Sequence, residues 1–125
     1  MQSLGVFDYG KVEPIVDELL LANATVNSPG ESEIIEIAGA KHVDVLIVIG
    51  GAVGAPNITF SLDVVEELTG AVIRSYQSNQ LAGAGTDYIT VEGLTLGTTV
   101  KLSWSGTLDG ANYFTGVTVR LIAKR

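Results

Sequence analysis

The stretch that decides the fold lies near the C-terminus and reads TGVTVRLI, residues 115–122. Its odd positions from Val117 to Leu121 are apolar, whereas Thr118 and Arg120 between them are polar. Successive side chains of a strand point to opposite faces, so this segment buries one face and exposes the other. The alternation predicts a half-buried β-strand.

Similar alternation recurs along most of the chain. Further strands are predicted over residues 32–37, 42–49, 58–64, 72–76, 88–92 and 100–104. Turn-forming residues separate them, as in NSPG at 27–30 and the Asp-Gly step at 109–110. We therefore predict an all-β domain, an antiparallel two-sheet β-sandwich of jelly-roll type with about eight strands.

The segment that follows Pro14 allows two interpretations. Residues 15–22 read IVDELLLA, and their Glu, Leu and Ala favour a helix, in which Pro is tolerated at the first position. The all-β context and the following Thr25 and Val26 favour a strand instead. The strand is the interpretation preferred here.

The first 13 residues show no clear period. They form either an arm that packs on a neighbour or a frayed terminus, and the sequence does not separate these readings. The chain thus divides into this segment, 1–13, and a sandwich domain, 14–125. Candidate partner contacts are Leu4, Val6, Phe7, Tyr9 and Tyr113.

The composition supports one compact domain with an aliphatic core. The chain has 125 residues, of which 46% are hydrophobic but only 6% aromatic, so Val, Ile, Leu and Ala must supply the core. Because the hydrophobic share is large, some of these apolar side chains are expected in contacts between subunits. In segment 42–49, Leu46 and Val48 make the second face apolar, as expected for a central strand or one covered by a partner.

Charge and cysteine content exclude several classes of partner. The 14 acidic residues outnumber the 7 basic ones. The basic residues are scattered along the sequence, without the clusters of Lys and Arg that are typical of nucleic-acid-binding proteins. There is no Cys, hence no disulfide and no cysteine zinc site. The longest apolar stretch, 43–55, is too short for a membrane helix, and no secretory signal precedes the domain. We expect a protein made in the cytoplasm, with no nucleic-acid or membrane partner.

The glycine-rich segment GGAVGAP, residues 50–56, fails as a nucleotide loop. Its glycines do not have the dinucleotide spacing, a strand pattern follows instead of a helix, and no Lys-Ser or Lys-Thr pair is present. It is interpreted as a flexible hairpin connection, and no cofactor is predicted.

No catalytic or metal-binding group is predicted either. His42 and Asp44 share a strand face, so Asp44 could orient His42 beside a serine, but nothing marks a nucleophile elbow or oxyanion hole. The acidic residues are interpreted as solvent-facing, including Asp63 and Glu66, which favours a solvated acidic face over a calcium site. The chain is therefore predicted not to be an enzyme.

Two segments near the C-terminus, GTTVKLSWSGT at 97–107 and YFTGVTVRLIAK at 113–124, carry a family resemblance. They resemble the ending of small virion proteins of tailed bacteriophages. The middle is also similar, with EIIEIAGAK at 33–41 and ITFSLDV at 58–64. The likeness covers roughly residues 31–124, but many such proteins carry a Ser-x-Asp-Gly-x-x-Trp segment where this chain has VEELTGAV, residues 65–72.

The resemblance implies a structural role and transfers no catalytic residue. It implies a capsid decoration (head auxiliary) protein that sits on the capsid surface of the virion and stabilises the shell. Its partners would be the lattice of the major capsid protein and further copies of itself, with a homotrimer favoured.

Two other readings stay open beside this one. One is a phage fibre or surface module that binds a host glycan by stacking on Trp104, Tyr76, Tyr88, Tyr113 or Phe114. The other is a bacterial surface module unrelated to phage. Trp104 lies in phase with apolar neighbours, which favours a place in the core.

Overall fold

The computed structural model describes residues 14–37, 39–94 and 99–125. The regular secondary structure in these residues consists of β-strands. No helix that could cross a membrane occurs among them. The strands are β1 (Pro14–Val26), β2 (Gly30–Glu31), β3 (Ile35–Glu36), β4 (His42–Ile49), β5 (Gly51–Val53), β6 (Thr59–Val65), β7 (Val72–Gln77), β8 (Gly85–Glu92), β9 (Thr99–Ser105) and β10 (Tyr113–Lys124).

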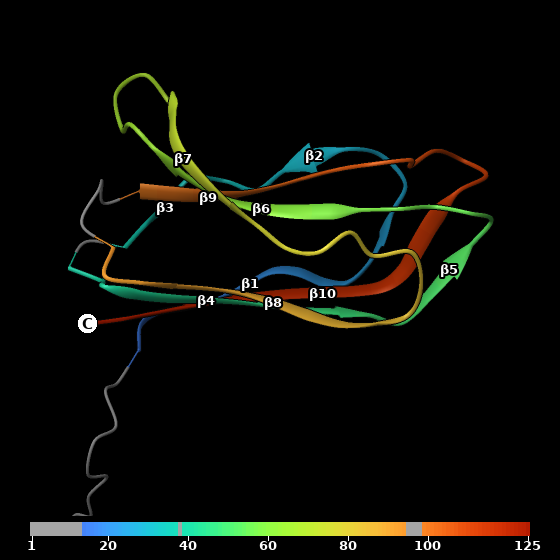
Figure 1. Ribbon diagram of the computed structural model, residues 1–125, viewed down its shortest axis with the longest axis horizontal. Helices are drawn as coiled ribbons and strands as arrows, with labels where there is room; N and C mark the ends of the chain where they lie inside the picture. Colours follow the sequence, from blue (N-terminus) through green and yellow to red (C-terminus); the bar gives the residue numbers. More distant parts are fainter. Residues whose placement is uncertain (1–13, 38, 95–98) are drawn as a thin grey trace, which may run out of the picture.

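These strands form two stacked antiparallel sheets (Figure 1). The first, here the β4 sheet, has the order β1-β10-β4-β8, and β5 also pairs with β10. The second, the β6 sheet, has the order β2-β9-β6-β7, and β3 also pairs with β9. The outer end of the β6–β7 hairpin rises above its sheet in Figure 1.

The strand order is that of a jelly roll. β2 and β3 share one place beside β9, and β4 and β5 share one place beside β10, so the ten strands occupy eight places. Numbered along the chain, the places follow the orders 1-8-3-6 and 2-7-4-5. This alternation between sheets is the double Greek key of the jelly roll. The predicted fold is confirmed.

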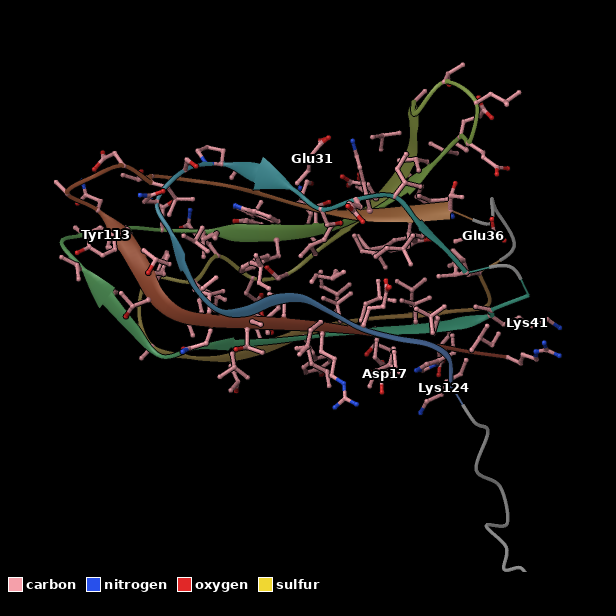
Figure 2. The ribbon with its side chains drawn as sticks, turned by 180° about the vertical axis from the view of Figure 1, so that it is seen from behind. Asp17, Glu31, Glu36, Lys41, Tyr113 and Lys124 are labelled. Carbon is pink, nitrogen blue, oxygen red and sulfur yellow. The ribbon has the colours of Figure 1, made fainter. Side chains whose placement is uncertain are left out.

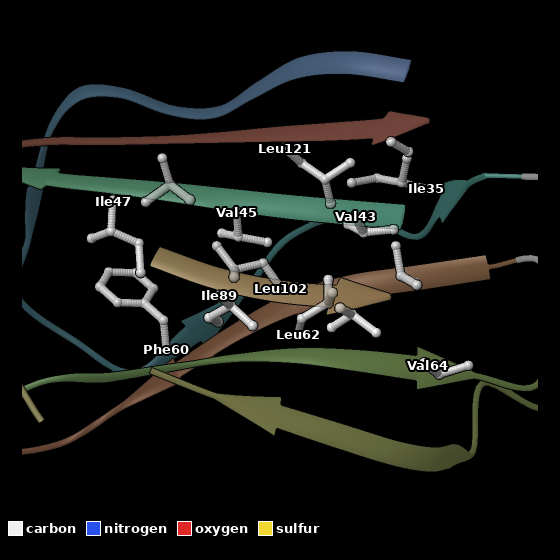
Figure 3. Packing of buried hydrophobic residues seen from close by; sticks show 14 of the residues in the cluster. Ile35, Val43, Val45, Ile47, Phe60, Leu62, Val64, Ile89, Leu102 and Leu121 are labelled. Atoms are coloured by element: carbon white, nitrogen blue, oxygen red, sulfur yellow. The ribbon is translucent and has the colours of Figure 1, made fainter. Parts of the chain in front are cut away.

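The core lies between the sheets, as Figure 3 shows. Val43, Val45 and Ile47 of β4 face Phe60 and Leu62 of β6, and all five are at most 1% exposed. Each comes from an alternating segment, so only one face of each strand enters the core. Full burial of such a side chain contributes about 1.5–3 kcal/mol, so these buried faces are a main source of the stability of the fold.

The decisive C-terminal stretch occupies the middle of the β4 sheet. Val117, Val119 and Leu121 are fully buried, whereas Arg120 is exposed, as predicted. β10 pairs with β1 on one side and with β4 and β5 on the other. The ambiguous segment after Pro14 is a strand because β10 needs a partner along that edge.

Two connections differ from the sequence-based prediction. Segment 32–37 contributes only Ile35–Glu36 to a strand, while Gly30 of the predicted turn already pairs with Trp104. Segment 50–56 is not a simple hairpin loop, since Gly51–Val53 pairs with β10 before the chain crosses to the other sheet. Both departures arise because β9 and β10 are long enough to accept a second short partner.

Candidate functional site

The outer face of the β4 sheet carries four exposed apolar side chains. They are Leu19 on β1 (60% exposed), Leu46 (40%) and Val48 (46%) on β4, and Tyr88 on β8 (65%). We call these four residues the apolar patch. Single exposed apolar residues are common, whereas several on one sheet face form a candidate contact surface.

The strand register places three of the four in one row. Leu19 lies opposite Arg120 of β10, Arg120 lies opposite Leu46, and Leu46 lies opposite Tyr88. Paired positions point to the same face, so the row crosses the whole sheet. The predicted apolar second face of β4 is confirmed, on a strand that is central in its sheet.

The β8 side of the apolar patch is hollowed. A shallow depression of about 410 Å³ lies over β4 and β8, where β8 is the last strand of its sheet. Its lining residues are Leu46, Ile47, Val48, Thr86, Asp87 and Tyr88. A partner's apolar side chain could enter this depression and gain buried area.

An ion pair interrupts the apolar row. Arg120 donates from Nε and Nη2 to the two carboxylate oxygens of Asp17, at 2.7 and 2.6 Å. These hydrogen bonds hold the pKa of Asp17 below its ordinary value and raise the pKa of Arg120. Figure 2 shows Asp17 on the outer side of the sheet. The positive charge on Arg120 is thus matched within the chain, which lowers the cost of covering it.

A second polar network surrounds His42. Its Nε2 lies 2.9 Å from Asp44 Oδ2, and its Nδ1 lies 3.4 Å from Glu92 Oε1. Thr90 donates its hydroxyl to Asp44 at 2.8 Å. Burial raises the pKa of Asp44, but the hydrogen bonds from Thr90 and His42 outweigh burial and leave that pKa lowered.

The geometry of this network does not suit acid–base catalysis on a hydroxyl. Both ring nitrogens of His42 face carboxylates, and the nearby Thr90 hydroxyl is directed to Asp44 instead. A nucleophile–base pair needs the hydroxyl within reach of the imidazole. Within residues 14–37, 39–94 and 99–125, no group of three or more His, Asp or Glu side chains could hold a metal ion.

Asp63 corrects the prediction of a solvent-facing carboxylate. Its side chain does point away from the core, but only 6% of the residue is exposed. Hydroxyls of Ser61 on the same strand, Ser75 on β7 and Ser103 on β9 donate to it at 2.7–2.8 Å. The alternation placed Asp63 on the correct face, but two of the covering serines, Ser75 and Ser103, are distant in sequence.

The aromatic residues considered for glycan stacking do not gather on one surface. Trp104, Tyr76 and Tyr113 are half-buried and Phe114 is fully buried, so only Tyr88 of the five is exposed. The Trp104 ring packs against the Phe60 ring at 6.3 Å between centroids. Trp104 was predicted to lie in the core. It packs against the edge of the core and is half-buried, so this prediction is confirmed in part.

The candidate contacts from the sequence are only partly described. Leu4, Val6, Phe7 and Tyr9 lie outside the described residues. Tyr113 is half-buried at the start of β10, opposite Val53. It lies at the far end of the sandwich from Lys124, which pairs with Pro14 (Figure 2). The point where the chain enters the sandwich is thus roughly 36 Å from Tyr113 along β10.

Sequence reasoning did not single out Leu19 as a surface residue or place Tyr88 beside Leu46. Both contribute to the apolar patch, but they are 27 and 42 residues from Leu46 in the chain. Only the strand register brings them together. The sequence signal for this surface was the second apolar face of β4, formed by Leu46 and Val48.

Comparison with solved structures finds a protein of similar fold. The fold is similar to the crystal structure of the SPBc2 prophage-derived protein YomS, with a TM-score of 0.55 and 17% sequence identity. The match covers 88% of this chain and 94% of that one. No protein-family model matches the chain. No curated protein matches it either. At this identity the likeness concerns the fold.

Proposed function

We propose that this chain is a structural virion protein of a tailed phage, a capsid decoration protein that binds and stabilises the outer surface of the shell. The observation that carries the proposal is the apolar patch on an otherwise acidic protein. A partner that covers such a patch removes apolar surface from water, and this stabilises the complex. The similarity to a prophage-derived protein and the C-terminal resemblance to phage virion proteins support a phage origin.

The proposed mechanism is mass action on the assembled lattice. A protein that binds the expanded shell and not its dissociated subunits shifts the equilibrium toward the intact shell. Several copies held together by symmetry, most simply a trimer at a local threefold axis, would turn weak single contacts into tight attachment. In this arrangement the apolar patch faces the shell.

The test uses shells assembled from the major capsid protein encoded in the same genome. The chain is mixed with expanded and unexpanded shells, and binding is measured by co-sedimentation. We expect saturable binding to expanded shells and a higher melting temperature of the decorated shells. Absence of binding to expanded shells would contradict the proposal.

A matched pair of variants assigns the surface. Leu19→Glu places a charge within the apolar patch, whereas Leu68→Glu makes the same change at the tip of the β6–β7 hairpin, where Leu68 is 92% exposed. Both sites are exposed, so both variants should fold. We expect Leu19→Glu to lose shell binding and Leu68→Glu to keep it. The reverse pattern would move the contact to the hairpin.

The glycan-binding alternative has less support. Stacking on sugar rings needs exposed aromatic faces, and of the aromatic residues considered only Tyr88 offers one. A glycan screen with the purified chain tests this reading. Saturable binding that is lost in Tyr88→Ser would favour it over shell attachment.

A further inference from the structure

The β6 sheet carries a site that the proposed function does not use. Asp63 lies at the middle of β6, and its carboxylate accepts hydrogen bonds from three strands. Ser61 and Ser75 donate to Oδ1 at 2.7 Å, and Ser103 donates to Oδ2 at 2.8 Å. We call Asp63 and these three serines the Asp63 site.

The cationic side chain nearest in register to Asp63 is engaged with another carboxylate. Lys101 is paired directly opposite Asp63 in the β6–β9 register, but its Nζ lies at 3.1–3.2 Å from the carboxylate oxygens of Glu31. Across the described part of the chain, none of the ion pairs includes Asp63. The hydrogen bonds to Asp63 come from neutral hydroxyls, so they satisfy its oxygens but leave its net negative charge available to a cationic ligand.

A depression of about 450 Å³ opens over Asp63 on the outer face of the sheet. Its lining residues are Thr59, Ser61, Asp63, Ser75, Gln77, Ser103, Trp104 and Ser105. It is thus bordered mainly by hydroxyl and amide groups, in contrast to the depression over the apolar patch.

The direction of these hydrogen bonds determines which class of ligand the depression can bind. A serine hydroxyl has one proton and two acceptor lone pairs. Ser61, Ser75 and Ser103 each give that proton to Asp63, so each can only accept a hydrogen bond from a ligand. Acceptor oxygens over a buried negative charge favour a ligand that is both a donor and positively charged.

A divalent metal ion fits this site poorly. Calcium takes six to eight oxygen ligands at roughly 2.3–2.6 Å, usually from several carboxylates. The site has a single carboxylate, and the three hydroxyl protons already occupy it. The depression is also far larger than one ion needs.

We propose that the Asp63 site binds a cationic head group, an alkylammonium or a guanidinium, as presented by a Lys or Arg side chain of a partner protein. Such a head group carries several N–H donors on one positive charge and can satisfy the serine oxygens together. The open outer face lets a side chain enter from a flat partner surface. This contact is separate from the apolar patch, which lies on the other sheet.

The test is an NMR titration of the full ¹⁵N-labelled chain with capped amino acids. The probes are N-acetyl-lysine methylamide, N-acetyl-arginine methylamide and, as the neutral control, N-acetyl-glutamine methylamide. Binding should shift the amide signals of Ser61, Ser75 and Ser103 with the two cationic probes only. Equal shifts with the glutamine probe, or no shift with either cationic probe, would overturn the proposal.

Two variants tie the binding to the carboxylate. Asp63→Asn keeps the shape but removes the charge, and we expect affinity for the cationic probes to fall about tenfold or more. Ser75→Ala, at an exposed position, removes one acceptor and should weaken binding by a smaller factor; it serves if Asp63→Asn fails to fold. Unchanged affinity in the folded variants would refute the site.

A last arm separates the sources of the head group. Putrescine presents ammonium groups without a peptide, so tighter binding of putrescine than of the capped lysine would identify a free polyamine as the ligand and overturn the protein partner. Tighter binding of a capped lysine or arginine supports the partner side chain. Binding of neutral oligosaccharides at the same amides, without an effect of the cationic probes, would refute the cationic site.

Discussion

Gly106 sits where two connections of the sandwich meet. Its φ is +150°, and a Cβ at this position would overlap the backbone carbonyl of Asn57. The Asn57 side chain also ties this loop by accepting from the Thr107 N–H at 3.1 Å. We therefore expect Gly106→Ala to lower the free energy of unfolding by about 1–3 kcal/mol, because either the backbone or the asparagine must move.

Urea unfolding followed by the fluorescence of the single tryptophan, Trp104, measures this loss. Gly83→Ala is the matched control, since a Cβ at Gly83 meets nothing within 4 Å. If both variants unfold at the same urea concentration, the close approach at Gly106 is not a constraint on the fold.

Asp63 shows how far single residues can be predicted from the sequence. Alternation along β6 correctly places Asp63 on the face opposite to Leu62. Its burial could not be predicted, because the covering hydroxyls of Ser75 and Ser103 come from strands 12 and 40 residues away. Burial of a polar residue on an outer face depends on register, and register is a property of the folded sheet.

At the scale of elements, strands that fill the core were predictable and short ones were not. The sequence pattern located β4 and β6 almost to the residue because their inner faces are continuous apolar rows. β2, β3 and β5 have two or three residues each, too few to show a period. They form because β9 and β10 offer unpaired backbone groups along their length.

The turn of the β6–β7 hairpin depends on one carboxylate. Glu66 accepts hydrogen bonds from the Leu68 N–H and from the N–H and hydroxyl of Thr69, all at 2.9 Å. These bonds hold the pKa of Glu66 below its ordinary value of 4.5. A carboxyl group whose folded pKa is depressed contributes stability above its unfolded pKa and loses it as the pH falls through the folded value.

We therefore expect Glu66→Gln to be less stable than the parent chain at pH 7 and the difference to shrink as the pH falls below 4.5. Urea midpoints of both proteins across this pH range measure the effect. Glu67→Gln, one residue along and exposed, is the control and should leave the midpoint unchanged at pH 7. A constant difference at all pH values would show that Glu66 acts through its shape and not its charge.

The N-terminal segment is a second element that can be tested by itself. β1 begins at Pro14 and pairs along β10, so removal of residues 1–13 leaves every described strand in place. We expect the shortened chain to keep the parent's urea midpoint. If residues 1–13 are an attachment arm and not a frayed terminus, it also loses attachment to expanded shells, since the candidate contacts Leu4, Val6, Phe7 and Tyr9 are removed. Retained co-sedimentation with shells would exclude the arm from attachment.

For the whole molecule, the outer face of the β4 sheet is a surface that a partner can cover. The inner faces of both sheets are filled, while the outer face of the β4 sheet keeps the apolar patch exposed. That patch can be covered by the shell or by another copy of the chain, and these two cases predict different behaviour in solution. In the proposed arrangement the shell covers it, and a trimer forms through other surfaces.

Size-exclusion chromatography with light scattering separates the two cases. We expect the purified chain to run as a trimer of about 39 kDa, three times the 13.1 kDa of one chain. The Leu19→Glu variant should remain trimeric and yet fail to bind shells, because the charge falls on the shell-facing side. If Leu19→Glu is instead monomeric, the apolar patch is the subunit interface, and shell contact must come from another face. A monomeric parent chain at micromolar concentration would remove the avidity on which tight attachment depends.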